Sequence, residues 1–332
     1  MIPKPLGFAG QHHQTFRTRH GWSRALQLAP DLYPGVGGKR FRATLVQRAY
    51  EFAGGAGAAP PQMIDAVEML HAGSLVIDDF EDGSQTRRNQ PSLHRLIGAA
   101  RAVNAGNWMY FRALELAGAA CDDPAGRGQL LSQFIEVARQ CHEGQAIDLS
   151  TRADELTPRQ TLATALAISR WKTGRLVSLA AWCGAHAAGG DADALRNAFA
   201  FGCRIGICLQ MKNDFDELVA FCDGGERCDD LRNRRVSWPW AWAAYLTPEE
   251  QFVSFQRRLT RCHQDLAMVR ELACELLAII HDHGGNQIRA RLQRASELLI
   301  SGSTAAHEPH LLAEVADVLR VAKDSKVAEA SR

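Results

Sequence analysis

The sequence predicts an all-α protein, and two observations carry this prediction. Apolar residues recur at spacings of three and four from residue 41 to residue 319, which is the periodicity of helices with one buried face. No stretch shows the alternation of Val, Ile and Thr with polar residues that is typical of strands. We therefore expect helices joined by short connections along nearly the whole chain.

The expected helices end at clusters of glycine, proline and aspartate, which favour turns. The clusters are short, so we interpret them as connections between helices and not as domain linkers. They lie at 54–61, 122–128, 187–193, 223–230 and 283–286. We predict a single domain over 1–332, with a poorly ordered N-terminal segment at about 1–20 and a poorly ordered tail at about 324–332.

Composition excludes several classes of protein. Hydrophobic residues make up 46% and charged residues 23% of the chain, a globular mixture and not a disordered one. The net charge of +1 gives no basic footprint of the kind expected for nucleic-acid binding. The nine cysteines form no CxxC pair, which favours a reduced, cytoplasmic compartment. We expect no transmembrane segment and, because the N-terminus lacks a signal-peptide core, no secretion.

The most informative segment is the expected helix at 62–82. Its apolar face continues in register to Asp78 and Asp82, which point the same way because they are four residues apart, with Asp79 beside them. At an effective dielectric of about 20, two like charges 4 Å apart repel by about 4 kcal/mol. A divalent cation would relieve this repulsion, and a ligand set made only of oxygens favours Mg²⁺. The alternative is a solvated acidic helix end.

Two arginines follow this acidic run. Arg87 and Arg88 place guanidinium groups next to the carboxylates, an arrangement suited to an anion bound through a bridging metal. Their presence favours the metal interpretation over a solvated helix end. Acidic residues, metal, phosphate and arginines then form one set.

A second acidic cluster lies about 130 residues later. Gln210, Asp214 and Glu217 share a helical face, with Asn213 adjacent. Taken alone, this cluster is an ordinary acidic helix end. If the two clusters face one cavity, they would hold several Mg²⁺ ions around one diphosphate.

Basic residues occur at two places that suggest anion binding: the expected start of a helix and the interior of an apolar helix. Lys39, Arg40 and Arg42 follow two glycines at the expected start of a helix, where the helix dipole favours anions. The alternative is an ordinary loop, because the segment is not the GxxxxGK[ST] nucleotide loop. Lys172 and Thr173 interrupt an otherwise apolar helix, where a lysine that extends to solvent is the alternative.

Together these residues resemble the trans-isoprenyl (polyprenyl) diphosphate synthases, and most closely the geranylgeranyl diphosphate synthases. The resemblance runs from about residue 33 to residue 239, and its most specific stretch is EMLHAGSLVIDDFEDGSQTRRNQPSLH at 68–94. It implies a single bundle of about a dozen helices around a deep central cavity, usually in a homodimer. It also implies that an allylic diphosphate condenses with isopentenyl diphosphate, assisted by about three Mg²⁺ ions.

The resemblance also implies a role for each candidate residue. Three residues would form the first metal motif, with two direct Mg²⁺ ligands, Asp78 and Asp82, and Asp79 in support. The second metal motif would comprise Asn213, Asp214 and Glu217. Arg87 would hold the allylic diphosphate. The pocket for isopentenyl diphosphate would comprise Lys39, Arg42, His71 and Arg88. The residues beside the allylic diphosphate and its developing cation would be Lys172, Thr173 and Gln210.

The chain departs from the family pattern in its second half. Asn213 stands where the family has Asp, which removes one negative charge from the second motif. Gly225 replaces a customary lysine, with Arg227 nearby, whereas Arg235 keeps the charge of a second lysine that binds the diphosphate. We therefore expect the second motif and the residues after it to bind the diphosphate more weakly or in a different way.

Product length should depend on the side chains below the first motif. Gly73 and Ser74 are small, so we expect an open tunnel at their level. The resemblance places the tunnel floor at Tyr110, Phe111 and His142. We therefore expect a product of twenty carbons, geranylgeranyl diphosphate.

Two other function classes stay open. A class I terpene cyclase acts on a single prenyl diphosphate, and an Asn in the second motif fits it, but the residues for a second substrate argue against it. A non-catalytic partner subunit of a synthase is suggested by Asn213 and Gly225. An inactive subunit would not need the complete first motif, so a synthase is the favoured interpretation.

Overall fold

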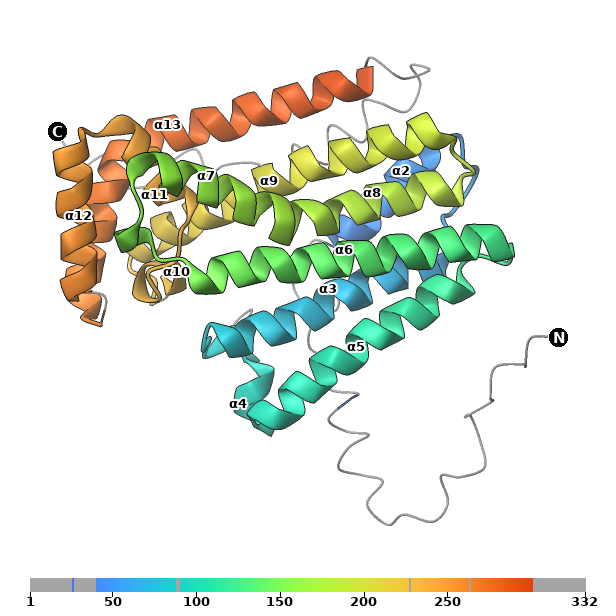
Figure 1. The fold of residues 1–332 in the computed structure, drawn as a ribbon, viewed down its shortest axis with the longest axis horizontal. Helices are drawn as coiled ribbons and strands as arrows, with labels where there is room; N and C mark the ends of the chain where they lie inside the picture. The colour runs from blue at the N-terminus through green and yellow to red at the C-terminus, as the bar shows by residue number, and fades with distance from the viewer. Residues whose placement is uncertain (1–25, 27–39, 88–89, 227, 263, 301–332) are drawn as a thin grey trace, which may run out of the picture. The chain divides into compact units, whose positions relative to one another are not determined.

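The computed structural model describes Leu26 and residues 40–87, 90–226, 228–262 and 264–300. These residues confirm the all-α prediction, since they form helices and one hairpin of two-residue strands (Figure 1). The segments predicted to be poorly ordered, about 1–20 and 324–332, lie outside the described residues, as do Lys39 and Arg88. Within the described ranges, no helix is long and apolar enough to cross a membrane.

The elements follow one another in the order of their labels. The first part of the chain contains α2 (Phe41–Phe52), α3 (Pro61–Glu81), β1 (Thr86–Arg87), β2 (Gln90–Pro91), α4 (Leu93–Ile97), α5 (Ala99–Ala119) and α6 (Pro124–Ser150). The middle contains the 3-10 turn η1 (Ala153–Glu155), α7 (Pro158–Ile168), the π-helix η2 (Ser169–Gly174), α8 (Arg175–Ala187) and α9 (Ala192–Cys222). The last part contains α10 (Asp229–Arg232), α11 (Trp238–Leu246), α12 (Glu249–Cys262) and α13 (Leu266–Ile300).

Four of the five predicted connections coincide with helix ends, but the break predicted at 283–286 is wrong. The helix α13 continues through this segment because Gly284 lets it pack closely against two aromatic rings. A Cβ atom at Gly284 would lie 3.0 Å from a ring carbon of Trp242 and 3.1 Å from ring carbons of Phe215. Here the glycine serves helix packing and does not end a helix.

The chain divides into two compact units, which we describe separately. The smaller unit includes Ala72–Phe111 and the larger unit includes Gly38–His71 and Arg112–Arg332. In the smaller unit, α3 and α5 cross closely at Gly73. A Cβ atom there would lie 3.0 Å from the carbonyl oxygen of Gly106 and 3.1 Å from the Cβ of Met109. The crossing therefore requires a residue without a side chain.

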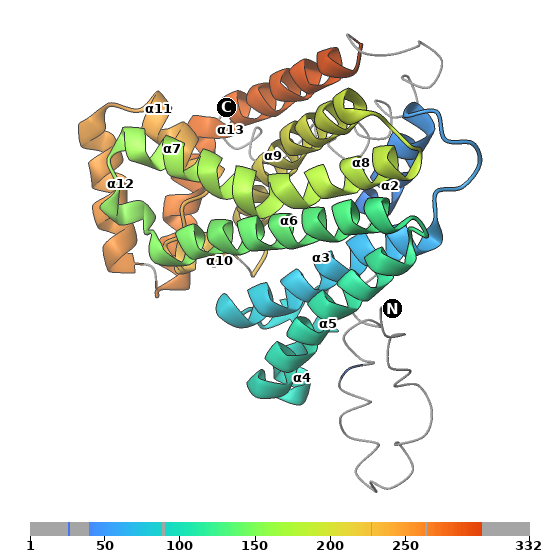
Figure 2. The ribbon, with the colours of Figure 1, turned by 45° about the vertical axis from the view of Figure 1, so that its right-hand side comes forward.

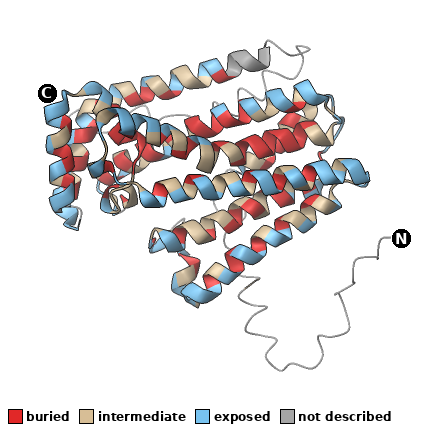
Figure 3. Cartoon of the chain, viewed as in Figure 1, coloured by how far each residue is buried: buried red, intermediate tan, exposed pale blue. Residues whose placement is uncertain are grey.

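In the larger unit, α8 lies between α6 and α9 (Figures 1 and 2). Every residue from Leu176 to Ala185 is buried, which explains why this helix is apolar on all sides (Figure 3). A second group of buried side chains joins α9, α11, α12 and α13, and includes Phe221, Trp238 and Phe252. Each large apolar side chain contributes about 1.5–3 kcal/mol when it is fully buried. These helices provide a rigid support for the polar residues at the ends of α6, α7 and α9.

Candidate active site

The first acidic cluster lies where α3 ends in the smaller unit. Gly83 has a φ of +66°, a left-handed conformation that glycine adopts without strain. The amide of Ser84 donates to the carbonyl of Asp79 at 2.9 Å, and the amide of Gly83 donates to that of Phe80 at 3.2 Å. This is the Schellman pattern of a helix C-terminus. It ends the helix immediately after the acidic run.

The chain then turns back in the β1–β2 hairpin, in which Thr86 pairs with Pro91 and Arg87 with Gln90. The hydroxyl of Ser92 donates to the carbonyl of Ser84 at 2.6 Å and closes the base of this turn. The hairpin thereby returns Arg87 to the helix end that precedes it.

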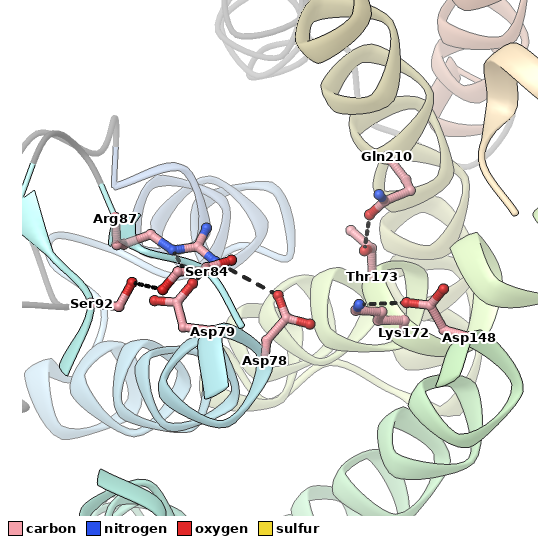
Figure 4. Close-up of polar contacts among 9 residues, drawn as sticks. All are labelled: Asp78, Asp79, Ser84, Arg87, Ser92, Asp148, Lys172, Thr173 and Gln210. Carbon is pink, nitrogen blue, oxygen red and sulfur yellow. Dashed lines mark hydrogen bonds and ion pairs between the residues drawn. The ribbon is translucent and has the colours of Figure 1, made fainter. Parts of the chain in front are cut away.

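Arg87 and the fully buried Asp79 form a partly buried ion pair (Figure 4). The Nε of Arg87 donates to Oδ1 of Asp79 at 2.9 Å, and its Nη2 contacts the same oxygen. Asp79 is fully buried, whereas Arg87 and Asp78 keep 27% and 20% of their side chains exposed. Nη2 of Arg87 also lies 3.7 Å from Oδ2 of Asp78. Asp79 thus holds the guanidinium in place, and Asp78 presents a carboxylate beside it.

Asp82 lies one turn beyond Asp78, and its amide donates to the carbonyl of Asp78 at 2.9 Å. Both side chains are partly exposed, as the spacing predicts for the ends of an acidic run. Among the described residues, no three His, Cys, Asp or Glu side chains converge as a ready metal site. The assignment of Asp78, Asp79 and Asp82 to a metal therefore stays a prediction, based on the chemistry of their oxygens.

The second cluster lies in the larger unit around the π-helix η2. A π-helix adds a residue to a helical turn and commonly marks a functional site. Here it carries Lys172 and Thr173. The Nζ of Lys172 donates to Oδ2 of Asp148 on α6 at 2.9 Å, and Oγ1 of Thr173 donates to Oε1 of Gln210 on α9 at 2.5 Å (Figure 4). The wider turn thus directs adjacent side chains to two different helices.

A chain of hydrogen bonds continues from Gln210 to Asp214. The Nε2 of Gln210 donates to Oδ1 of Asp214 at 2.6 Å, and the amide of Trp238 donates to Oδ2 at 2.9 Å. Burial raises the pKa of Asp214 to about 7, against the opposing effect of these two hydrogen bonds. The nearby charges of Glu217 and Asp148 raise this pKa further. A cation placed here would relieve the repulsion between these carboxylates.

Two acidic residues of this cluster were not predicted from the sequence. Asp148 binds Lys172, and its carbonyl oxygen accepts a hydrogen bond from Nη1 of Arg235 at 2.8 Å. The pKa of Asp230 is raised well above its usual value by burial and by the charges of Glu217, Asp214 and Asp148. The signal for Asp148 was its place on the buried face of α6, in register with Leu130, Phe134, Val137 and Gly144. An acid on such a face needs a partner.

The other predicted residues of the larger unit lie as follows. Arg42 and His71 are partly buried, and Asn213 is exposed on α9. Oε1 of Glu217 accepts a hydrogen bond from the amide of Asp229 at 2.7 Å. The carbonyl of Gly225 accepts from Nη2 of Arg270 at 2.8 Å, so an arginine of α13 holds the loop in which the family lysine is missing. Arg227 lies outside the described residues.

The residues predicted to set product length have different surroundings. The space next to Gly73 is filled by α5, so the helix crossing accounts for its small size. Ser74 and Tyr110 are partly buried, whereas Phe111 is 70% exposed and His142 is exposed. Their role in chain length stays a prediction from the resemblance.

The sequence profile described as Polyprenyl synthetase matches residues 24–277 of the chain. Geranylgeranyl pyrophosphate synthase 2 of Zymoseptoria tritici is 31% identical over 216 residues, which are 64% of this chain and 61% of that protein. Geranylgeranyl pyrophosphate synthase of Eremothecium gossypii is 31% identical over 212 residues, covering 61% of this chain and 64% of that protein. The chain therefore spans less than two thirds of the length of these relatives.

Solved structures show the same fold. A polyprenyl synthase of Caulobacter crescentus, complexed with calcium and isoprenyl diphosphate, matches with a TM-score of 0.74 at 24% identity. The match covers 90% of this chain and 93% of that chain. A geranylgeranyl pyrophosphate synthetase of Pyrococcus horikoshii matches with a TM-score of 0.72 at 24% identity, over 90% of this chain and 91% of that chain.

Proposed function

The chain belongs to the polyprenyl synthetase family, and we propose that it condenses isopentenyl diphosphate with an allylic diphosphate. The observation that carries this proposal is the partly buried Asp79–Arg87 pair, which fixes a guanidinium beside the partly exposed carboxylate of Asp78. An anion-binding group and a cation-binding group side by side are what a metal-bound diphosphate requires. In this reaction the allylic substrate loses its diphosphate, and the double bond of isopentenyl diphosphate forms a carbon–carbon bond to the resulting cation. A proton then leaves the condensed product and passes to the released diphosphate.

The donor set fits Mg²⁺. Carboxylates supply oxygen ligands at Asp78, Asp82, Asp214 and Glu217, and Asn213 supplies a carbonyl oxygen, while neither cluster includes a His or Cys ligand. We propose that these residues, with Asp79 in support, hold about three Mg²⁺ ions. Bound Mg²⁺ would neutralise negative charge on the leaving diphosphate. The replacement of Asp by Asn213 leaves the second motif with one charge less.

Lysine and arginine side chains of the chain bind the diphosphate groups directly. Arg87 and Lys172 bind oxygens of the allylic diphosphate as negative charge grows on it, each held in place by a buried carboxylate. Thr173 and Gln210, which are joined by a short hydrogen bond, lie beside the allylic diphosphate and orient it. The residues proposed to bind isopentenyl diphosphate are Lys39, Arg42, His71 and Arg88, and Arg235 adds a positive charge next to Lys172.

We further propose geranylgeranyl diphosphate as the product. Two relatives are named geranylgeranyl pyrophosphate synthases, and the small side chain of Ser74 would leave the product tunnel open at its level. A homodimer is the proposed assembly. Trp108 and Phe111, one turn apart on α5, leave 37% and 70% of their side chains exposed, a surface that a second copy would cover. The free cysteines among the described residues fit the proposed cytoplasmic location.

The second candidate is a class I terpene cyclase. Asn213 favours it, because an Asn is common in the second metal motif of such cyclases. Arg42 and His71, the described residues assigned to a second substrate, favour the synthase.

One assay separates these functions. The purified protein is incubated with Mg²⁺, labelled isopentenyl diphosphate and, in turn, dimethylallyl, geranyl and farnesyl diphosphate. We expect labelled alcohols of twenty carbons after phosphatase treatment. Unlabelled hydrocarbons would indicate the cyclase, and no turnover with any primer would indicate a non-catalytic partner subunit.

A further inference from the structure

A groove on the larger unit is lined by residues of α6, α7, η2, α8 and α9. Its volume is about 820 Å³, within the range of about 300–1,000 Å³ that is typical of small-molecule sites. The wall on α9 runs from Ala192 to Ile207, a helical length of about 22 Å. A groove of this volume is large enough for a small-molecule ligand.

One end of the groove has an excess of positive charge. Arg170, Arg175 and Arg204 line it, and none of their side chains forms an ion pair or hydrogen bond with a described residue. The acid in the wall, Glu136, is already paired with Arg139, which is outside the lining. Three guanidinium groups without a carboxylate favour an anion, and a phosphate can accept two parallel hydrogen bonds from one guanidinium.

Two aromatic rings hold the guanidinium of Arg175 in a fixed position at the groove. Its guanidinium carbon lies 4.8 Å from the ring centre of Trp171 and 5.3 Å from that of Phe199. These two rings fix the group by cation–π contacts and by packing. Its Nε is buried and has no hydrogen-bond partner among the described residues. The part of the Arg175 side chain that lines the groove can donate to an anion there.

The other end of the groove is electrically balanced. Trp182 and Leu195, 5% and 9% exposed, line it together with Gln129 and Gln133. Between the two ends, Phe199 adds an apolar ring to the wall. The arginine at this end, Arg196, is paired with Asp193. We propose that the groove binds an anionic amphiphile, with a phosphate head group on Arg170, Arg175 and Arg204 and an apolar chain toward Trp182 and Leu195.

This site is separate from the candidate active site, although both use the π-helix η2. Lys172 and Thr173 bond to Asp148 and Gln210, and none of these four residues lines the groove. The proposal therefore does not depend on the proposed function.

Dodecyl phosphate, below its critical micelle concentration, is the probe, and calorimetric titration in EDTA measures binding without divalent metal. We expect one site per chain, with affinity at least tenfold higher than for inorganic phosphate or for octyl glucoside. Arg175→Gln should weaken this binding at least tenfold, and Arg204→Gln severalfold. The matched control is Arg196→Gln, which should change it less than twofold. Lys172→Gln, a change in the candidate active site, should also leave it within twofold.

Binding that is unchanged in both Arg175→Gln and Arg204→Gln would overturn the proposal, as would loss of binding in Lys172→Gln. Equal affinity for inorganic phosphate would show a simple anion site and overturn the assignment of an amphiphile. Thermal melting checks that each variant is folded, and Arg204→Gln provides the test if Arg175→Gln is not. Sedimentation with vesicles containing phosphatidic acid identifies the source of the ligand. If the protein binds the vesicles and this binding requires Arg175, the ligand is a lipid head group. If the protein binds dodecyl phosphate but not the vesicles, the ligand is a free amphiphile.

Discussion

Asp79 in the first acidic cluster and Asp214 in the second are both buried, but their surroundings differ. In the smaller unit Asp79 is fully buried and contacts the guanidinium of Arg87, so a full positive charge balances it. In the larger unit Asp214 is 7% exposed and accepts hydrogen bonds from two neutral donors, Gln210 and the amide of Trp238. Burial accordingly raises the pKa of Asp214 to about 7. The first cluster is balanced by the protein itself, whereas the second gains more from a bound cation.

The largest expected effect follows from removing the partly exposed carboxylate of the balanced cluster. Asp78→Ala should lower kcat at least about 100-fold, because a ligand of the metal-bound diphosphate is lost while Asp79 still holds Arg87. Steady-state kinetics with labelled isopentenyl diphosphate measures this loss. Glu81→Ala, on the same turn of α3 and exposed, is the matched control and should retain activity. Normal turnover of Asp78→Ala would show that the metal assignment is wrong.

The next prediction compares the two buried aspartates directly through stability. Asp79→Asn should lower the free energy of unfolding by about 3 kcal/mol, since it leaves the partly buried Arg87 without its ion pair. This is the lower end of the usual range for breaking a buried pair, because Arg87 is 27% exposed. Asp214→Asn should change it by less than about 1 kcal/mol, because it removes a buried charge together with one neutral hydrogen bond. Urea unfolding without metal measures the free energy of unfolding of both variants. Equal decreases in the two variants would contradict the proposed difference between Asp79 and Asp214.

A smaller effect is expected from the residue that positions Lys172. Asp148→Asn removes the negative charge from the contact of 2.9 Å with Nζ of Lys172 and should lower kcat about tenfold. KM for isopentenyl diphosphate should stay within twofold, because Lys172 is assigned to the allylic diphosphate. Asp148→Glu should restore part of kcat by restoring the charge. A parallel change in both KM values, without rescue by Glu, would indicate a purely structural role for Asp148.

The sequence predicted well those features that depend on neighbouring residues. The end of α3 is encoded by Gly83 directly after the acidic run, and the contact between Asp79 and Arg87 spans only eight residues. The helical periodicity was equally local, and the structure confirms it. Such features need only the preferences of a few adjacent residues.

Features that depend on distant packing were not predicted. Nothing in the sequence Ser-Arg-Trp-Lys-Thr-Gly separates a π-helix from an α-helix, because the difference lies in how η2 packs on α6 and α9. Asp148 and Lys172 are 24 residues apart, so their contact follows from the fold. The continuation of α13 through Gly284 likewise depends on Phe215 and Trp242, which belong to other helices.

The smallest expected effect tests the electrostatic side of the comparison. Asn213 is exposed on α9, next to the buried Asp214, so Asn213→Asp adds a carboxylate without disturbing packing. Because the second cluster lacks a cationic contact on Asp214, the added charge should strengthen Mg²⁺ binding and lower the Mg²⁺ concentration for half-maximal activity two- to fivefold, about 0.4–1 kcal/mol. Unfolding without metal should show no gain in stability, since the new carboxylate repels Asp214 and Glu217. Kinetics over a Mg²⁺ series measures the shift, and the partly buried pair of Lys212 and Asp216 provides a control through Asp216→Asn. If Asn213→Asp raised the Mg²⁺ requirement instead, the charge deficit of the second motif would not be what limits metal binding there.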